Sequence, residues 1–241
     1  MPAGTRRLDT ASGPMDVYEA TPDGVRLGGV IVIPEAYGVN DYIRRVVRDL
    51  ADEGYHAVAP DVFHRVGISE VPYGDVQKAI EVIGAMRDDE ALEDVDAALL
   101  LLRASELDDH DIGVVGFCMG GRLSFLVALE RALGAAVGFY GGGIVSSRGP
   151  TRPALIERVT ELRAPWLGLF GDDDRSIPID DVETLRDGLR AASVETDVVR
   201  YAGAGHGFHC DHRADYAPHA AADAWRRTIS WLERHLAPPG N

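Results

Sequence analysis

Short apolar runs alternate with amphipathic stretches along almost the whole chain. Runs of small and β-branched residues, such as 28–34 and 112–115, are followed by stretches whose apolar residues recur every three or four positions. The first pattern is typical of strands buried on both faces, and the second of helices that bury one face. The alternation predicts an α/β fold: a mostly parallel sheet with helices on both faces, arranged as a three-layer sandwich.

The elements follow from these patterns and from turn and capping residues. A β-hairpin is expected over 5–20, around the turn signal at 12–14, and Asn40 is a candidate helix cap. Further strands are expected at 28–34, 55–60, 112–115, 135–140, 165–170 and 196–201. Helices are expected at about 40–50, 75–87, 89–105, 122–129, 179–192 and 217–236, with loops at 61–75 and 141–163. We find no repeat or linker and expect one domain over residues 1–241.

Charge narrows the classes of partner. The formal net charge is −15, and Lys78 is the only lysine among 24 basic residues. An acidic surface argues against nucleic acid or an anionic membrane as a partner. A small molecule is the expected substrate, and an anionic one would need a local arginine to offset the overall field.

The cysteine count and the N-terminus bear on location. Cys118 and Cys210 are the only cysteines, too few for a disulfide framework. The first residues lack the apolar stretch of a signal peptide, and no run approaches the length of a membrane span. We expect a cytoplasmic protein without a cofactor, as a monomer or a small homo-oligomer.

The stretch 116–121, here called the elbow, carries the first candidate chemistry. It reads Gly-Phe-Cys-Met-Gly-Gly between an apolar run and a helix-compatible run. A strand that turns sharply into a helix through small residues is the geometry of a nucleophile elbow, G-x-S-x-G, with Cys118 in place of serine. The thiol would lie just before the first helical turn, where free N–H groups favour a thiolate.

Two later strand ends supply an acid and a base. The segment 171–178 holds three consecutive aspartates, of which we favour Asp174 over Asp172 because it precedes the Ile177-Pro178 turn into the next helix. The segment 203–208 holds His206 among glycines. Ligand sites of parallel sheets lie at the carboxyl ends of the strands. The order cysteine, acid, histidine therefore predicts a nucleophile, a carboxylate that orients the imidazole, and a base.

A fourth strand end, after 28–34, begins with Glu35. The loop that follows such a strand supplies one backbone N–H of an oxyanion hole, and the residue after the nucleophile supplies another. We assign these two donors to Ala36 and Met119. Position alone leaves Glu35 either a surface carboxylate or a member of the site.

The chain resembles the dienelactone hydrolase (carboxymethylenebutenolidase) family, a cysteine-using branch of the α/β hydrolases, over nearly its whole length. The resemblance rests on 34–40, 54–61, the elbow, Tyr140-Gly141, Asp174 with Ile177-Pro178, and 205–208.

The resemblance implies a triad of Cys118, His206 and Asp174, with Glu35 contacting the resting cysteine and helping to deprotonate it when substrate binds. The implied reaction is hydrolysis of an enol-lactone or activated ester through an acyl-enzyme.

One position departs from the family pattern. Members that act on dienelactone have an arginine four residues after the histidine, where this chain has Cys210. Arg213, Arg65 or Arg87 could replace it in binding a substrate carboxylate. The residues expected to contact substrate are Tyr37, Tyr140, Arg87, Phe208 and Arg213.

Three other interpretations remain at this point. The side chains His206, His209, Cys210, Asp211 and His212 contain spacings that can chelate zinc. A thiol redox or sensing protein would use Cys118 with Cys210 as its resolving partner. A binding protein on a hydrolase scaffold would have lost catalysis, although each expected catalytic position is filled. We favour the hydrolase, without a metal.

Overall fold

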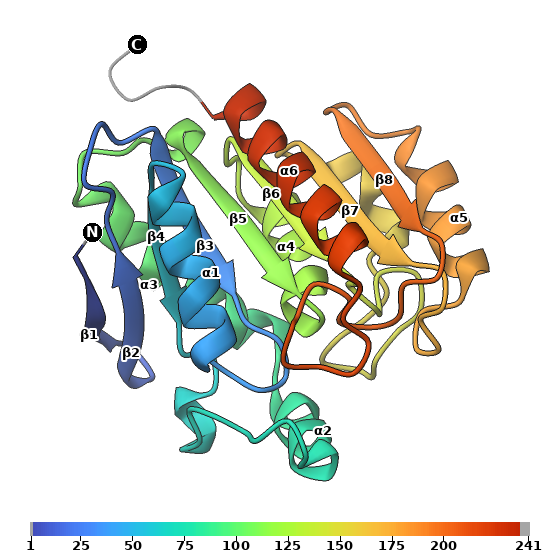
Figure 1. The fold of residues 1–241 in the computed structure, drawn as a ribbon, viewed down its shortest axis with the longest axis horizontal. Helices are drawn as coiled ribbons and strands as arrows, with labels where there is room; N and C mark the ends of the chain where they lie inside the picture. Colours follow the sequence, from blue (N-terminus) through green and yellow to red (C-terminus); the bar gives the residue numbers. More distant parts are fainter. Residues whose placement is uncertain (1, 237–241) are drawn as a thin grey trace.

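The computed structural model describes residues 2–236, whose strands form one eight-stranded sheet in the order β1-β2-β4-β3-β5-β6-β7-β8 (Figure 1). The strands are β1 (Ala3–Thr10), β2 (Gly13–Ala20), β3 (Gly28–Ile33), β4 (Tyr55–Pro60), β5 (Ile112–Phe117), β6 (Ala135–Phe139), β7 (Trp166–Gly171) and β8 (Thr196–Tyr201). The helices are α1 (Asp41–Asp52), α2 (Val76–Ala85), α3 (Asp88–Arg103), α4 (Met119–Glu130), α5 (Ile179–Leu189) and α6 (Pro218–His235), with short 3₁₀ helices η1 (His64–Val66), η2 (Asp109–Asp111) and η3 (Ile156–Glu161).

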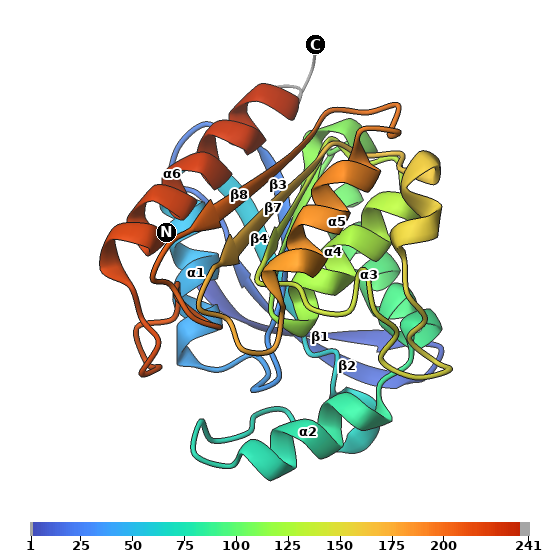
Figure 2. The same cartoon turned by 90° about the vertical axis from the view of Figure 1, so that its right-hand side faces the viewer.

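Helices cover both faces of the sheet. Helices α1 and α6 lie on one face, and α3, α4 and α5 lie on the other, as the two orthogonal views agree (Figures 1 and 2). The strands from β4 to β8 in sheet order pair in parallel, whereas β1 and β2 form an antiparallel hairpin whose second strand pairs with β4. The three-layer α/β prediction is confirmed, and the expected elements lie within a few residues of the observed ones.

Local sequence explains why these elements form. Every residue of β3, β4, β5, β6 and β7 is buried, as their continuous apolar runs predict for strands covered on both faces. Helix α1 begins where expected, because the Asn40 side chain accepts a hydrogen bond from the N–H of Ile43. Its apolar stripe, which includes Val46, Val47 and Leu50, is buried against the sheet.

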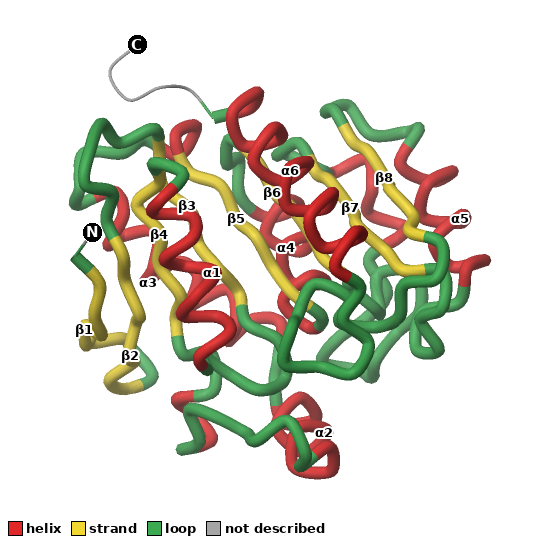
Figure 3. Tube along the Cα trace, viewed as in Figure 1, coloured by secondary structure: helices red, strands yellow, loops and turns green. Residues whose placement is uncertain are grey.

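The parallel strands end together at one edge of the sheet, where Figure 3 shows long loops gathered. Register places Ile33 of β3 opposite Gly116 of β5, and Phe139 of β6 opposite Phe117. The residues that follow these three strands therefore emerge side by side.

Helix α2 lies apart from the sheet, beyond this edge (Figures 1 and 2). Only Ala79 and Val82 of α2 are buried, while the side chain of Ile80 is exposed. Within residues 2–236, no helix is long and apolar enough to cross a membrane.

Candidate active site

Cys118 occupies a strained turn between β5 and α4. Its backbone angles, φ of 54° and ψ of −114°, lie outside the regions that residues other than glycine ordinarily adopt. A Cβ atom on Gly116 would lie 1.9 Å from the carbonyl oxygen of Gly120, and one on Gly120 would lie 2.3 Å from that of Ile33. The elbow glycines are therefore needed for close backbone approach, which presses the first turn of α4 against the end of β3.

The loops after β7 and β8 are tied to each other. The N–H of Asp172 donates to the carbonyl of Tyr201 at 3.0 Å, and the N–H of Asp173 donates to that of Ala204 at 2.9 Å. A Cβ on Gly171 would lie 2.2 Å from the Ala204 oxygen, so the two loops are in direct contact. This packing fixes Asp174 relative to His206.

Cys118, His206 and Asp174 form a continuous hydrogen-bonded row. His206 Nε2 lies 3.0 Å from Cys118 Sγ, and His206 Nδ1 lies 2.6 Å from Asp174 Oδ2. The other carboxylate oxygen of Asp174 accepts bonds from the backbone N–H and the hydroxyl of Ser176, at 2.8 and 2.7 Å. Asp174 is 5% exposed, so its carboxylate is held with both oxygens engaged.

Electrostatics favours a charged pair in this row. Burial lowers the pKa of His206, but the Cys118 sulfur and Asp174 outweigh it and raise that pKa to about 10. Burial also acts to raise the pKa of Asp174, yet its bond to His206 and its contacts with Ser176 leave that pKa below its ordinary value. At neutral pH His206 is therefore an imidazolium, bonded to the Asp174 carboxylate on one side and facing the Cys118 sulfur on the other.

Glu35 emerges beside Cys118, since it follows β3 as Cys118 follows β5. Its side chain is completely buried, and Oε2 accepts a hydrogen bond from Arg213 Nη1 at 3.2 Å. Oε1 has no hydrogen-bond partner within residues 2–236. The resemblance implied a contact between this carboxylate and the resting thiol; here Cys118 is bonded to His206 and Glu35 to Arg213.

Glu35→Gln is expected to lower stability, because it leaves the Arg213 guanidinium without its buried counter-charge. Breaking one half of such a pair costs about 3 kcal/mol. Chemical denaturation should measure this loss, and the double variant Glu35→Gln/Arg213→Gln should recover most of it. Equal stability of wild type and Glu35→Gln would show that the ion pair contributes little.

The two backbone N–H groups assigned to an oxyanion hole have no acceptor within residues 2–236. Met119 is the first residue of α4, so its N–H has no partner inside the helix. No backbone carbonyl or side chain of residues 2–236 accepts the N–H of Ala36, in the loop after β3. The packing of α4 on β3 places these loops next to each other, as an oxyanion hole requires.

A cleft of about 520 Å³ opens onto Cys118 and His206. One part of its wall is apolar and comes from α2 and the start of α4, with Ile80, Ile83, Met86 and Leu123. Another part is cationic and contains Arg87, Arg122, Arg148 and Arg152. A cleft of this size and composition suits a small organic molecule.

The three aromatic residues among the expected substrate contacts do not line this cleft. Tyr140 and Phe208 are both 0% exposed and do not line the cleft. The ring of Tyr140 contacts that of His206, with centroids 5.2 Å apart, and Phe208 packs behind Tyr140 at 5.4 Å. Tyr140 therefore packs against the imidazole, and Phe208 packs against Tyr140. Tyr37 is 7% exposed and lies against Tyr73, with Arg213 over its ring.

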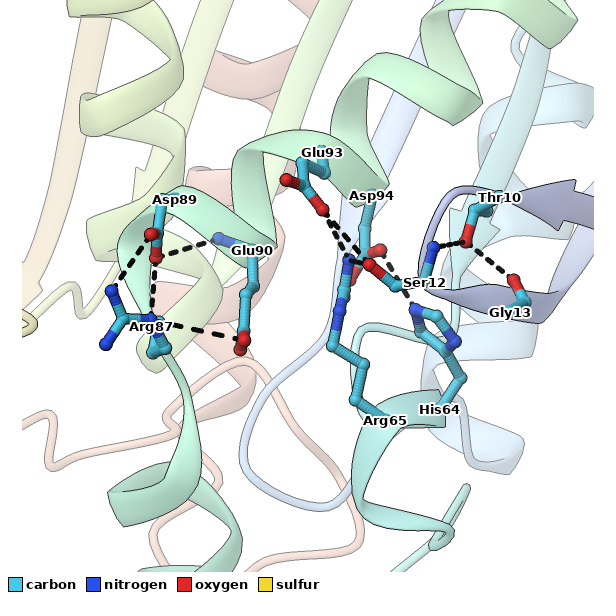
Figure 4. Close-up of polar contacts among 10 residues, drawn as sticks. All are labelled: Thr10, Ser12, Gly13, His64, Arg65, Arg87, Asp89, Glu90, Glu93 and Asp94. Atoms are coloured by element: carbon cyan, nitrogen blue, oxygen red, sulfur yellow. Dashed lines mark hydrogen bonds and ion pairs between the residues drawn. The ribbon is translucent and has the colours of Figure 1, made fainter.

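Two of the candidate arginines are held by carboxylates of α3 (Figure 4). Arg65 pairs with buried Asp94 at 2.6 Å and with Glu93, and does not line the cleft. Arg87 lines the cleft but binds Asp89 through two hydrogen bonds of 3.0 Å. Arg213, the third candidate, is engaged by Glu35.

The loop after His206 sends its side chains to separate partners. His209 is bonded to the Tyr42 hydroxyl at 2.8 Å, and burial, followed by the charge of Arg45, lowers the pKa of His209 to about 4. Asp211 pairs with Arg45. No group of three or more potential ligands able to hold a metal occurs within the described residues.

Cys210, the expected resolving cysteine of the redox interpretation, is also 0% exposed. Its sulfur lies 3.2 Å from the Tyr73 hydroxyl. Burial and the charge of Glu35 raise the pKa of Cys210 to about 11. This is the environment of an inert cysteine rather than a reactive one.

Four residues at the site were not predicted from the sequence: Ser176, Arg122, Arg148 and Arg152. Ser176 was detectable, because a serine two residues after an aspartate is a common turn that satisfies the carboxylate. Arg122, Arg148 and Arg152 were not, since no periodicity or motif distinguishes them from surface arginines.

The chain is similar in sequence and in structure to known proteins. A sequence model described as "Dienelactone hydrolase family" matches residues 15–236. A "Putative carboxymethylenebutenolidase" of Salmonella typhimurium is 36% identical over 245 residues, covering 99% of this chain and 89% of that protein. A "Probable 2-oxo-3-(5-oxofuran-2-ylidene)propanoate lactonase" of Bradyrhizobium is 33% identical, covering 88% and 85% of the two chains. The crystal structure of a "Putative Dienelactone Hydrolase" from Klebsiella pneumoniae has a TM-score of 0.87 and 34% identity, covering 96% and 98%.

Proposed function

Because the chain belongs to the dienelactone hydrolase family, we propose that it hydrolyses a lactone or an activated carboxylic ester through an acyl-enzyme on Cys118. The observation that carries the proposal is the row in which His206 joins Cys118 Sγ at 3.0 Å to Asp174 at 2.6 Å. The row opens onto the cleft of about 520 Å³. The names of two relatives, "Putative carboxymethylenebutenolidase" and "Probable 2-oxo-3-(5-oxofuran-2-ylidene)propanoate lactonase", support the same reaction class.

Acylation begins with the Cys118 thiolate, which attacks the carbonyl carbon of the substrate. The developing oxyanion accepts hydrogen bonds from the N–H groups of Ala36 and Met119. The C–O bond then breaks, His206 gives its Nε2 proton to the departing oxygen, and a thioester remains on Cys118. A lactone or ester with a stable enolate leaving group needs little of this proton transfer.

Deacylation follows from a change in the charge around His206. The thiolate is foremost among the groups that raise the pKa of His206, and thioester formation removes its charge. The pKa of His206 therefore falls, and the neutral imidazole accepts a proton from the attacking water. Expulsion of the thiolate releases the carboxylic acid and restores the charged pair.

Glu35 acts on the thiol through an exchange of partners. Its orphaned Oε1 and its place beside Cys118 support a second position, in which the carboxylate contacts the sulfur. In the observed position the Glu35 carboxylate is bonded to Arg213, and the Cys118 sulfur to His206. Glu35 reaches the sulfur only when it leaves Arg213, so displacement of Arg213 activates the thiol.

The pH dependence of turnover should reveal the proton on His206. For an alkyl ester, kcat/KM is expected to fall as pH rises through about 10, the raised pKa of His206, because a neutral imidazole has no proton for the departing alkoxide. For an enol ester the decline should be weaker. Steady-state rates for both esters between about pH 6 and 10.5, corrected for spontaneous hydrolysis, measure the decline in kcat/KM for each ester. An identical decline in kcat/KM at high pH for the two esters would argue against proton donation by His206.

The decisive test of the function is trapping of the intermediate. Mixing the protein with a panel of lactones, aryl esters and thioesters, followed by acid quench and mass spectrometry, should reveal an acyl group on the peptide that contains Cys118. Hydrolysis without any Cys118 adduct, even under single-turnover conditions, would contradict the mechanism.

A further inference from the structure

A cluster of charged side chains joins η1 to α3, outside the residues that line the cleft (Figure 4). At its centre is Asp94, which is 0% exposed. His64 Nε2 lies 3.0 Å from one carboxylate oxygen of Asp94, and Arg65 Nη1 donates to the other at 2.6 Å. Arg65 Nη2 also donates to Glu93 of α3 and to Ser12 in the β1–β2 turn, both at 3.1 Å. These five residues are here called the Asp94 cluster.

Burial makes the geometry of this cluster specific. A carboxylate removed from water is costly unless its oxygens are engaged, and loss of one partner leaves a buried charge without compensation. Both oxygens of Asp94 are engaged, and both partners come from the three-residue helix η1. Asp94 therefore determines where η1 lies on α3.

The segment that contains η1 supports the C-terminal end of α2. Residues of the segments 62–66 and 85–91 line one small cavity of about 20 Å³, so the two segments face each other. Met86, which follows α2 and is 8% exposed, lines this cavity and also the cleft that opens onto Cys118. Met86 therefore lies between η1 and the space that would hold the substrate.

Helix α2 buries few side chains of its own, so its two ends determine where it lies. The loop before its N-terminal end is fixed to the loop after β3. There the N–H of Val71 donates to the carbonyl of Tyr37 at 3.1 Å, and Asn40 Nδ2 donates to the Tyr73 hydroxyl at 3.0 Å. This end is held without the Asp94 cluster, whereas the C-terminal end rests on η1.

We propose that Asp94 is a positioning residue for substrate selection, which holds η1 against α3 and thereby sets Ile83 and Met86 in the wall of the cleft. The proposal rests on the hydrolase function above and deepens it. The substrates that depend on Asp94 are esters or lactones whose apolar part is long enough to reach this wall. A small ester, bound at the elbow, does not depend on it.

The test compares two esters that share a leaving group, p-nitrophenyl hexanoate and p-nitrophenyl acetate. Asp94→Asn keeps the shape of the side chain but removes its charge. It should lower the ratio of kcat/KM for hexanoate over acetate about tenfold, chiefly through KM, because each methylene that loses its apolar contact costs about fourfold in binding. An unchanged ratio, or equal losses for the two esters, would overturn the proposal.

Two further variants control for folding. Asp96→Asn is the matched control, because Asp96 lies on the same helix but is bonded to Arg131 through two hydrogen bonds of 2.7 Å. It should leave the ratio unchanged, and a change as large as that of Asp94→Asn would contradict the proposal. If Asp94→Asn does not fold, Arg65→Gln decides in its place. This variant leaves Asp94 bonded to His64 and should lower the ratio in the same direction.

Hydrogen exchange separates the positioning role from the reaction. In the free protein, Asp94→Asn should accelerate backbone amide exchange in residues 82–86 about tenfold and leave that of α4 unchanged. If the wild-type protein hydrolyses neither ester, the proposed function fails, and this measurement still decides whether Asp94 positions the wall. Equal exchange of residues 82–86 in the variant and the wild type would overturn the proposal.

Discussion

Cys118→Ala should lower kcat/KM for an activated ester by about 10⁴-fold or more, because the proposed acyl-enzyme forms on the sulfur that this substitution removes. Alanine removes the sulfur bonded to His206 Nε2 while leaving the elbow backbone in place. The residual rate would come from the oxyanion hole and from binding alone. Steady-state hydrolysis of p-nitrophenyl butyrate measures the loss, and thermal unfolding verifies that the variant is folded.

The matched control is Cys210→Ala, the other thiol of the chain. Its sulfur is buried against the Tyr73 hydroxyl, whereas the hydrogen bonds of His206 go to Cys118, Asp174 and Ser176. We expect this variant to retain wild-type turnover within a few-fold. Full activity of Cys118→Ala, or equal losses in the two variants, would exclude a nucleophile at 118.

Asp174→Asn should lower kcat/KM by about 10³- to 10⁴-fold with little change in KM. Asparagine keeps the shape of the side chain but loses the charge that supports the His206 imidazolium at 2.6 Å. Its amide can also donate to Nδ1, which leaves the ring in the wrong tautomer toward Cys118. Steady-state kinetics on the same ester measures the effect.

Asp172→Asn is the comparison that tests the choice between neighbouring aspartates. Asp172 accepts a hydrogen bond from Arg200 at 2.7 Å and is not bonded to His206. We expect near-normal turnover and at most a small loss of stability, as for a partly exposed ion pair. Normal activity in Asp174→Asn together with a large loss in Asp172→Asn would reverse the assignment.

The features that could be predicted from the sequence share a local cause. The apolar runs of β3 and β5 fix which residues end a buried strand, and parallel pairing brings such ends to one edge. Glycines at 116 and 120 predict the sharp turn at Cys118, because a side chain at either glycine position would clash with neighbouring backbone. The placement of Cys118, Asp174 and His206 at one edge follows from these two facts.

The features that escaped prediction depend on partners distant in the chain. Arg213 and Glu35 are separated by 178 positions, and nothing in either neighbourhood indicates their ion pair. Arg65 is a substrate-binding candidate on the sequence alone, but in the fold its guanidinium donates to Asp94, 29 positions away. The burial of Tyr140 could not be anticipated, because an aromatic residue at a strand end can turn toward the cleft or beneath the histidine.

Helix α2 has a consequence for how this protein can diverge. It supplies Ile80 and Ile83 to the cleft, yet it lies apart from the sheet and buries only Ala79 and Val82. Substitutions on its exposed face therefore alter the shape of the cleft at small cost in folding free energy. Natural or laboratory selection can therefore change which acyl groups the cleft accepts through substitutions in residues 76–85. The elbow and the row of Cys118, His206 and Asp174 need not change.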